Sequence, residues 1–130
     1  TMRLPHGAIL TSATLSALKG DPKEIEIELE SARHKRVASQ PRGISSAGCI
    51  FRNPPSSDPA GAIIDRLGFK GRRVGTAGVS EKHANFIVNF GKAKAQDVIR
   101  LIDMIRRRVF EEEGIDLELE IKIVESGEPT

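Results

Sequence analysis

The sequence predicts an α+β domain, a small mixed sheet with about three helices, over residues 22–37, 59–67 and 94–113. Segments with helical spacing and segments with strand-like alternation follow one another without the regular strand–helix–strand order of an α/β protein. Hydrophobic residues make up 38% and charged residues 29% of the 130 positions, as is typical of globular proteins. A chain of this length supports one hydrophobic core, which excludes a second, cofactor-sized domain.

Charge and cysteine content exclude several classes of protein. The 20 basic and 18 acidic residues leave a net charge of only +2, which argues against a dedicated nucleic-acid binder. The single cysteine, Cys49, excludes an internal disulfide framework and is typical of a reducing compartment, so we expect a cytoplasmic protein. No apolar run approaches the ~18 residues of a membrane span. The three histidines have no metal-ligand spacing, and we expect no metal site.

The N-terminal residues 7–18 are rich in small and β-branched types, which predicts a strand. A strand needs a neighbour with which to pair. Two interpretations therefore remain open: an edge strand of the local sheet, or a strand that belongs to a domain absent from this chain.

The first helix is predicted by the signals at its start. Asp21 as N-cap, Pro22 at the first helical position and Glu24 two residues later are three independent helix-start signals. The alternation over residues 25–29 would by itself predict a strand. We give the caps precedence, because apolar and basic side chains also share one helical stripe, formed by Ile25, Leu29, Ala32 and Arg36.

Residues 39–61 form a loop-rich stretch with four prolines and three glycines. Loops of this length in a small domain are usually functional or disordered. The apolar residues Ile50 and Phe51 argue against disorder, so we interpret the stretch as functional. The second helix begins at Pro59, and Gly68 ends it.

The C-terminal half has the clearest periodicity. Residues 85–90 are predicted to form a strand, and residues 94–113 place apolar side chains at spacings of three and four until Gly114 ends the helix. Residues 115–123 alternate strictly between apolar and charged types. That alternation predicts a half-buried strand with one polar face.

Three segments in a fixed order resemble the C-terminal part of the UDP-N-acetylenolpyruvoylglucosamine reductase (MurB) family. The first contains S-A-G-C-I-F-R-N-P at residues 46–54, and the second contains V-S-E-K-H-A-N-F-I-V-N at residues 79–89. The third runs from Phe110 through the alternating segment to Ile123. Together with the residues between them, these segments cover essentially residues 20–125.

The resemblance implies a cytoplasmic flavoenzyme of peptidoglycan synthesis, in which NADPH reduces FAD and hydride passes to the enolpyruvyl group of UDP-N-acetylglucosamine enolpyruvate. The family binds FAD in an N-terminal region that has no counterpart here. It therefore implies a fragment that is inactive alone, binds no cofactor itself and has the missing FAD-binding region as a partner. Residues 1–20 would be a remnant strand and linker, residues 21–126 the substrate-binding domain and residues 127–130 a tail. Strand edges exposed by truncation could promote dimers.

The resemblance also implies two catalytic residues. Cys49 occupies the position of the family's proton donor, and a thiol is mostly protonated at neutral pH; without the motif, a small inert thiol would be the better interpretation. Glu120 matches the catalytic glutamate. If burial kept that carboxyl protonated, it could hydrogen-bond the negative charge that develops on the substrate. Periodicity alone does not separate Glu120 from Glu118, a solvent-side residue of the same face.

Two further positions match family contacts with the substrate. Asn53 could bind a phosphate or sugar oxygen, or could be an ordinary turn residue before Pro54. His83 matches a polar substrate contact and could otherwise be a surface or core histidine. The basic turn with Lys70, Arg72 and Arg73 could attract the diphosphate, although solvation of a turn explains these residues equally well.

Two other functions are weighed against the reductase domain. The isolated chain could be a non-catalytic UDP-sugar-binding module or an inert fragment. The basic clusters at residues 33–36, 70–73 and 106–108 could also suggest a small nucleic-acid binder. That alternative is weak, because acidic residues nearly balance the clusters and there is no Tyr or Trp on which bases could stack.

Overall fold

The computed structural model describes residues 7–55 and 57–124. Its contacts divide the chain into two units, Thr1–Ala32 and Arg33–Thr130, and each is described by itself. The expected tail at residues 127–130 lies outside the described residues.

The strand expected over residues 7–18 is not formed. These residues have no regular secondary structure, and all of them are exposed. The side chains of Ile9, Leu15 and Leu18 are 85%, 88% and 98% exposed. The residue types favour a strand, but no described strand pairs with this segment, and a strand requires a partner for its backbone hydrogen bonds.

Helix α1 (Pro22–Ser39) begins where its capping residue predicts. The Asp21 carboxylate oxygen Oδ1 accepts hydrogen bonds from the backbone N–H groups of Lys23 (2.9 Å) and Glu24 (3.2 Å), which satisfies donors that the first helical turn leaves free. None of the helix residues is buried, and the apolar stripe at Ile25 and Leu29 is exposed. Local hydrogen bonds therefore hold this helix.

The sheet has four strands in the order β1-β4-β3-β2, and every described pairing is antiparallel. Its strands are β1 (Ser45–Cys49), β2 (Arg73–Val74), β3 (Ala77–Val79) and β4 (Phe86–Asn89). The strand expected over residues 85–90 is thus present as β4, and the α+β class is confirmed. Strands β2 and β3 form a short hairpin in the glycine-rich segment.

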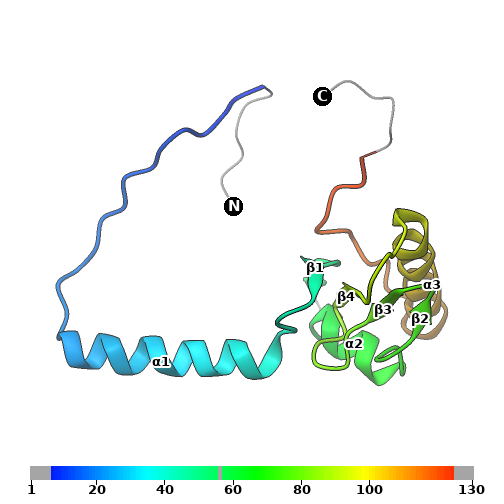
Figure 1. Cartoon of the computed structure of the whole chain (residues 1–130), viewed down its shortest axis with the longest axis horizontal. Coiled ribbons are helices and arrows are strands. Elements are labelled where there is room, and N and C mark those ends of the chain that lie inside the picture. Colours follow the sequence, from blue (N-terminus) through cyan, green and yellow to red (C-terminus); the bar gives the residue numbers. More distant parts are fainter. Residues whose placement is uncertain (1–6, 56, 125–130) are drawn as a thin grey trace. The chain divides into compact units, whose positions relative to one another are not determined.

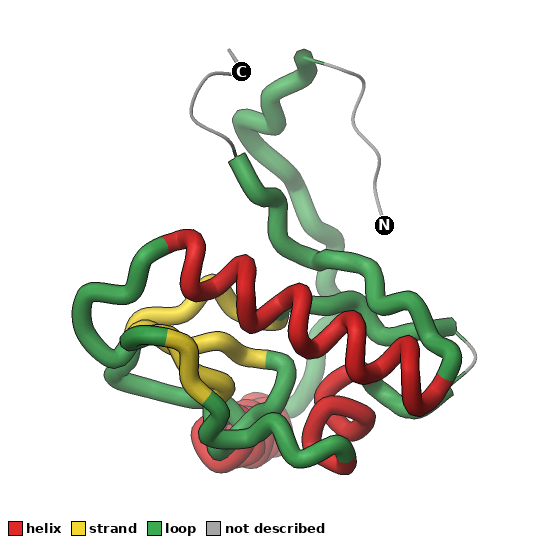
Figure 2. The backbone as a smooth tube through the Cα atoms, turned by 90° about the vertical axis from the view of Figure 1, so that its right-hand side faces the viewer, coloured by secondary structure: helices red, strands yellow, loops and turns green. Residues whose placement is uncertain are grey.

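Helices α2 (Ala60–Arg66) and α3 (Ala95–Glu113) confirm the other two predicted helices. Figure 2 shows α3 lying across the strands, with the short α2 beside it, and Figure 1 labels the same elements. Gly114, in the left-handed conformation with φ 67°, ends α3 as expected. The apolar stripe of α3 is buried in the core, which contains Ile50, Phe51, Ile63, Ile64, Val79, Ile87, Leu101, Ile102, Ile105, Val109 and Leu117.

The prediction of a strand over residues 115–123 is wrong, although apolar residues of this segment are more buried than the charged residues between them. Leu117 is fully buried while its charged neighbours are exposed. The segment makes one isolated antiparallel bridge, between Leu119 and Phe51. Two backbone bonds flank it, from Arg52 N–H to the Glu118 carbonyl (2.9 Å) and from Glu120 N–H to the Ile50 carbonyl (2.8 Å). The short segment at residues 50–52 is its only described partner, so no longer ladder forms.

Candidate functional site

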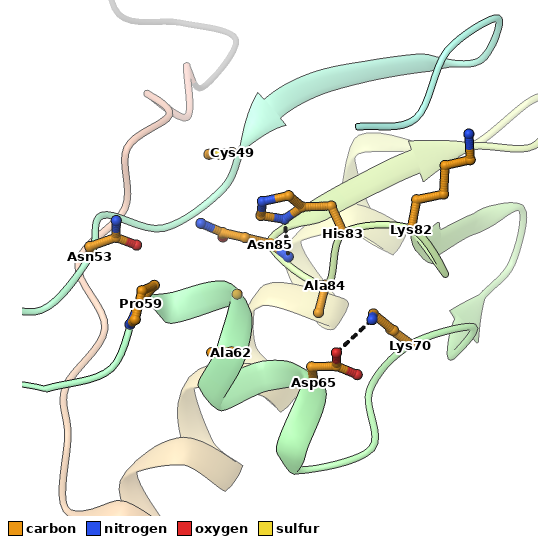
Figure 3. Close-up of a pocket in the computed structure, with 11 residues that line it drawn as sticks. Cys49, Asn53, Pro59, Ala62, Asp65, Lys70, Lys82, His83, Ala84 and Asn85 are labelled. Atoms are coloured by element: carbon orange, nitrogen blue, oxygen red, sulfur yellow. Dashed lines mark hydrogen bonds and ion pairs between the residues drawn. The ribbon is translucent and has the colours of Figure 1, made fainter. Parts of the chain in front are cut away.

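An open pocket of about 280 Å³ lies where the end of β1 meets the start of α2 and the turn before β4 (Figure 3). It brings together residues that are far apart in the sequence. Its lining consists of Cys49, Asn53, Pro59, Gly61, Ala62, Asp65, Lys70, Lys82, His83, Ala84 and Asn85. Three of the four predicted site residues, Cys49, Asn53 and His83, therefore line one pocket.

Cys49 reaches this pocket through an irregularity in β1. The pairing with β4 shifts between Ser46, which opposes Val88, and Cys49, which opposes Phe86, so that β1 contains one extra residue. Gly48, in the left-handed region with φ 85°, supplies the backbone conformation of this bulge. The thiol is partly buried. That burial, and secondly the negative charge of Glu120, raise the pKa of Cys49.

His83 is held by the turn that precedes β4. The buried hydroxyl of Ser80 accepts hydrogen bonds from the N–H groups of Lys82 (3.2 Å) and His83 (3.4 Å). The imidazole Nδ1 accepts the N–H of Asn85 at 3.2 Å, drawn as a dashed line in Figure 3. A neutral ring with Nδ1 as acceptor carries its proton on Nε2, which then serves as a donor. Burial, followed by the positive charge of Lys70, lowers the pKa of His83.

Asn53 combines the two interpretations that the sequence left open. It lines the pocket, and its side-chain oxygen also accepts the backbone N–H of Ala60 at 3.1 Å. Ala60 is the first residue of α2, so the carboxamide satisfies one of the free donors at the start of that helix. Asn53 therefore has a structural role whether or not it also contacts a ligand.

Glu120 is close to the pocket but is not among its lining residues. Its carboxylate oxygen Oε2 lies 3.2 Å from Nε of Arg52, and the Glu120 side chain is 58% exposed. The burial expected for this carboxyl is therefore not present in this chain. Glu120 is nevertheless near enough to Cys49 for its charge to raise the thiol pKa.

The three basic residues of the turn have different surroundings. Lys70 lines the pocket and forms an ion pair with Asp65 at 2.5 Å (Figure 3). Arg72 and Arg73 do not line it: their guanidinium groups lie over the rings of Phe69 and Phe90, 5.5 Å and 3.8 Å from the ring centroids. Aromatic stacking thus accounts for these two arginines.

Two residues that contribute to the site were not singled out in the sequence. Arg52 pairs with Glu120, and the buried Asn85 hydrogen-bonds the backbone of Phe51. Both residues lie inside the motifs that carry the resemblance, but no local spacing indicates that their side chains reach partners so distant in the sequence.

In the described residues, no group of three or more His, Cys, Asp or Glu side chains is arranged to hold a metal ion. Within the same residues, no helix combines the length and the apolar character needed to cross a membrane.

Comparison with known proteins gives one consistent match. The family described as "UDP-N-acetylenolpyruvoylglucosamine reductase, C-terminal domain" matches residues 40–124. The chain is 41% identical to the UDP-N-acetylenolpyruvoylglucosamine reductase of Syntrophobacter fumaroxidans, over 95% of this chain and 36% of the relative. It is 45% identical to that of Moorella thermoacetica, over 95% of this chain and 41% of the relative.

A solved structure supports the same match. The crystal structure of UDP-N-acetylenolpyruvylglucosamine reductase (MurB) from Thermus caldophilus superposes with a TM-score of 0.65 and 45% sequence identity. The match covers 82% of this chain and 37% of that structure. The chain thus spans about two fifths of the length of the relatives it matches.

Proposed function

The chain belongs to the UDP-N-acetylenolpyruvoylglucosamine reductase family, as its C-terminal domain, and on that premise we propose that it binds the UDP-sugar substrate and supplies a proton to it. The complete enzyme would reduce UDP-N-acetylglucosamine enolpyruvate to UDP-N-acetylmuramate in the cytoplasm. The observation that carries the proposal is the presence of Cys49, Asn53 and His83 on one pocket.

Reduction of an enolpyruvyl group adds a hydride to one carbon of its double bond and a proton to the other. After hydride addition, the second carbon and its carboxylate share negative charge and require a proton. Cys49 is suited to donate it, because burial and the charge of Glu120 raise its pKa and so keep the thiol protonated at neutral pH. The thiolate formed would then take a proton from solvent through the open pocket.

The other pocket residues are suited to hold the substrate. The Nε2–H of neutral His83 is a donor for a carboxylate, carbonyl or phosphate oxygen. Asn53 uses its Oδ1 to accept the N–H of Ala60, and its Nδ2 is suited to donate to a substrate oxygen. Lys70 contributes positive charge for the diphosphate, although Asp65 already neutralises part of it.

Glu120 is assigned the second catalytic role. Its charge favours the protonated thiol while Cys49 awaits the substrate. The pairing with Arg52 keeps its carboxylate beside the segment that carries Cys49. A role as a protonated hydrogen-bond donor would require the substrate or the rest of the enzyme to bury this half-exposed side chain.

The pocket that contains Cys49 has a volume of about 280 Å³, and we assign the UDP-sugar to it. We assign FAD and NADPH to the remaining three fifths of the enzyme, which precedes this domain in the relatives. The exposed apolar side chains of Ile9, Leu15 and Leu18 fit a surface that packs against that missing partner.

The proposal is tested in a full-length enzyme that carries this chain as its C-terminal part. We expect Cys49→Ala to slow reduction of the UDP-sugar by about 10²–10⁴-fold, the usual contribution of a general acid. Reduction of the flavin by NADPH, measured separately, should keep its rate. Equal slowing of both half-reactions would remove Cys49 from its assigned role.

A second candidate function is a UDP-sugar-binding module without catalysis. It is favoured by the finding that the chain spans only about two fifths of the length of its relatives. Titration of the isolated chain with the UDP-sugar, followed by NMR, addresses it. Shifts at His83 and Asn53 would indicate a preformed site. If Cys49→Ala then left turnover of the full-length enzyme unchanged, the binding module would be the better description.

A further inference from the structure

Asn85 is a buried polar residue at the centre of the site, with only 3% of its surface exposed. Its carboxamide makes two hydrogen bonds to the same residue. Oδ1 accepts the N–H of Phe51 at 2.9 Å, and Nδ2 donates to the carbonyl of Phe51 at 2.8 Å. The side chain therefore acts towards Phe51 as a strand backbone would, satisfying both of its polar groups.

The backbone of Asn85 extends this connection in two directions. Its carbonyl accepts the N–H of Ile50 at 2.8 Å, which continues the pairing of β1 with β4 one residue beyond Cys49. Its N–H donates to Nδ1 of His83 at 3.2 Å. One residue is thus bonded to the segment that follows Cys49 and to the imidazole of His83, which lines the same pocket.

The segment that Asn85 holds also carries the link to Glu120. The carbonyl of Ile50 accepts the N–H of Glu120 at 2.8 Å, and Phe51 forms the bridge to Leu119. Asn85 bonds one edge of residues 50–52, and the C-terminal segment bonds the other. Displacement of these residues would therefore move Glu120 relative to the thiol.

We propose that Asn85 is a positioning residue of this site: its buried side chain, through Phe51, sets the spacing of Cys49 and Glu120, while its backbone N–H holds the imidazole of His83. The residue does not touch the reacting atoms in this assignment; it acts through Phe51 and the imidazole. The catalytic consequence rests on the function proposed above, whereas the positioning itself is a property of the isolated chain.

Thiol alkylation measures the positioning directly, because Cys49 is the only cysteine in the sequence. The probe is iodoacetamide, which reacts with the thiolate. In Asn85→Ala, loss of both bonds to Phe51 should release residues 50–52, and we expect alkylation of Cys49 at neutral pH to become several-fold faster. Asn85→Asp keeps the acceptor and loses the donor, so we expect a smaller acceleration.

The specific readout is the dependence of this rate on Glu120. Glu120→Gln should accelerate alkylation in the otherwise unchanged chain, because the carboxylate charge disfavours the thiolate. The same substitution should have no effect in the Asn85→Ala chain, where the spacing is lost. If Asn85→Ala reacts as slowly as the parent chain, or keeps the full effect of Glu120→Gln, the proposal is wrong.

A matched control separates positioning from general loss of stability. Val109→Ala removes packing from the fully buried face of α3, and Val109 is not a pocket residue. This variant should keep both the slow alkylation and its dependence on Glu120. If Val109→Ala accelerates the reaction and loses this dependence as Asn85→Ala does, Asn85 merely stabilises the fold and the proposal fails.

A measurement on the parent chain keeps the test decisive if Asn85→Ala does not fold. The side-chain amide proton of Asn85 that bonds the Phe51 carbonyl should exchange slowly with solvent in NMR spectra, because the residue is buried. Rapid exchange of this proton would overturn the proposal. Because none of these readouts uses turnover, they are independent of whether Cys49 is the proton donor of the enzyme.

Discussion

The guanidinium group of Arg52 joins Glu120 to the segment that carries the thiol: Arg52 Nε lies 3.2 Å from Glu120 Oε2, while the Arg52 N–H bonds the backbone of Glu118. A second, longer contact of 3.6 Å connects Arg52 to the carboxylate of Glu118. The two carboxylates flank the same bridge, and Glu120 is the one whose charge raises the pKa of Cys49. This difference makes them a matched pair for experiment.

Glu120→Gln is expected to lower the pKa of Cys49, because it removes a negative charge that disfavours the thiolate. Burial would remain, so the pKa should stay above its ordinary value. The rate of alkylation against pH, fitted for the thiolate pKa, measures the change. Glu118→Gln is the control and should leave the profile unchanged; an equal shift in both variants would contradict a specific effect of Glu120.

Below neutral pH, His83 is expected to reduce the stability of the fold. Its folded-state pKa lies below the unfolded value of about 6.5, so the unfolded chain binds the extra proton first. The free energy of unfolding should therefore fall as the pH drops below about 6.5 and level off below the folded-state pKa. Protonation of Nδ1 would also remove the acceptor of the Asn85 N–H.

Chemical denaturation across this pH range, compared with His83→Gln, isolates that contribution. The variant has no group that titrates at this position, so its loss of stability over the same window should be smaller. Parallel pH dependence in the two proteins would show that other groups are responsible.

Gly61→Ala is expected to disturb the site more than the fold. A Cβ at residue 61 would lie 3.0 Å from Cε1 of His83, which is closer than ordinary packing allows. Alanine gains up to about 1 kcal/mol of helix propensity over glycine, which offsets part of the steric cost. We therefore predict a change in the free energy of unfolding within about 1 kcal/mol, a shifted His83 ring signal in NMR and weaker UDP-sugar binding.

The comparison for this variant is Ala62→Gly, at the next position of α2. It loses a similar propensity without approaching the imidazole, so it should lower stability and leave the His83 signal in place. Unchanged His83 signals and UDP-sugar affinity in Gly61→Ala would contradict the predicted contact.

Asp21→Ala is expected to shorten or unfold α1 without affecting the domain core. The substitution removes the acceptor for Lys23 and Glu24 at a cost of about 1 kcal/mol. Because no residue of α1 is buried, core packing does not compensate for this loss. Helical ellipticity should fall while the thermal midpoint of the domain stays constant. Asp21→Asn keeps a capping side chain and should retain the helix; equal loss in both variants would assign the helix to another cause.

Local sequence signals predicted the helices well because each signal acts within one or two turns. The Asp21 cap, the apolar stripe of α3 and the terminal Gly114 all satisfy or bury groups close to themselves in the chain. The two strand predictions that failed, over residues 7–18 and 115–123, failed for the opposite reason. A strand is completed by a partner elsewhere, and neither segment has one of sufficient length in the described residues.

For the candidate site, too, the sequence predicted some residues and missed others. The motifs identified Cys49, Asn53 and His83, and the structure places all three on one pocket. The motifs did not identify Asn85 as a site residue, because in the sequence it is an ordinary polar residue before a strand. Its role depends on Phe51, 34 positions earlier in the chain, and a hydrogen bond over that separation leaves no periodic signal.

By itself, the sequence determined the α+β class, the three helices and the residues that carry the family motifs, because propensity, capping and apolar spacing are local properties. Only the tertiary structure decided that Glu120 lies in an ion pair with Arg52 outside the pocket lining, and that Asn85 joins Phe51 to His83. The physical reason is that hydrogen bonds and charge pairs depend on distances of a few ångströms. The packing of the sheet, α2 and α3 sets those distances.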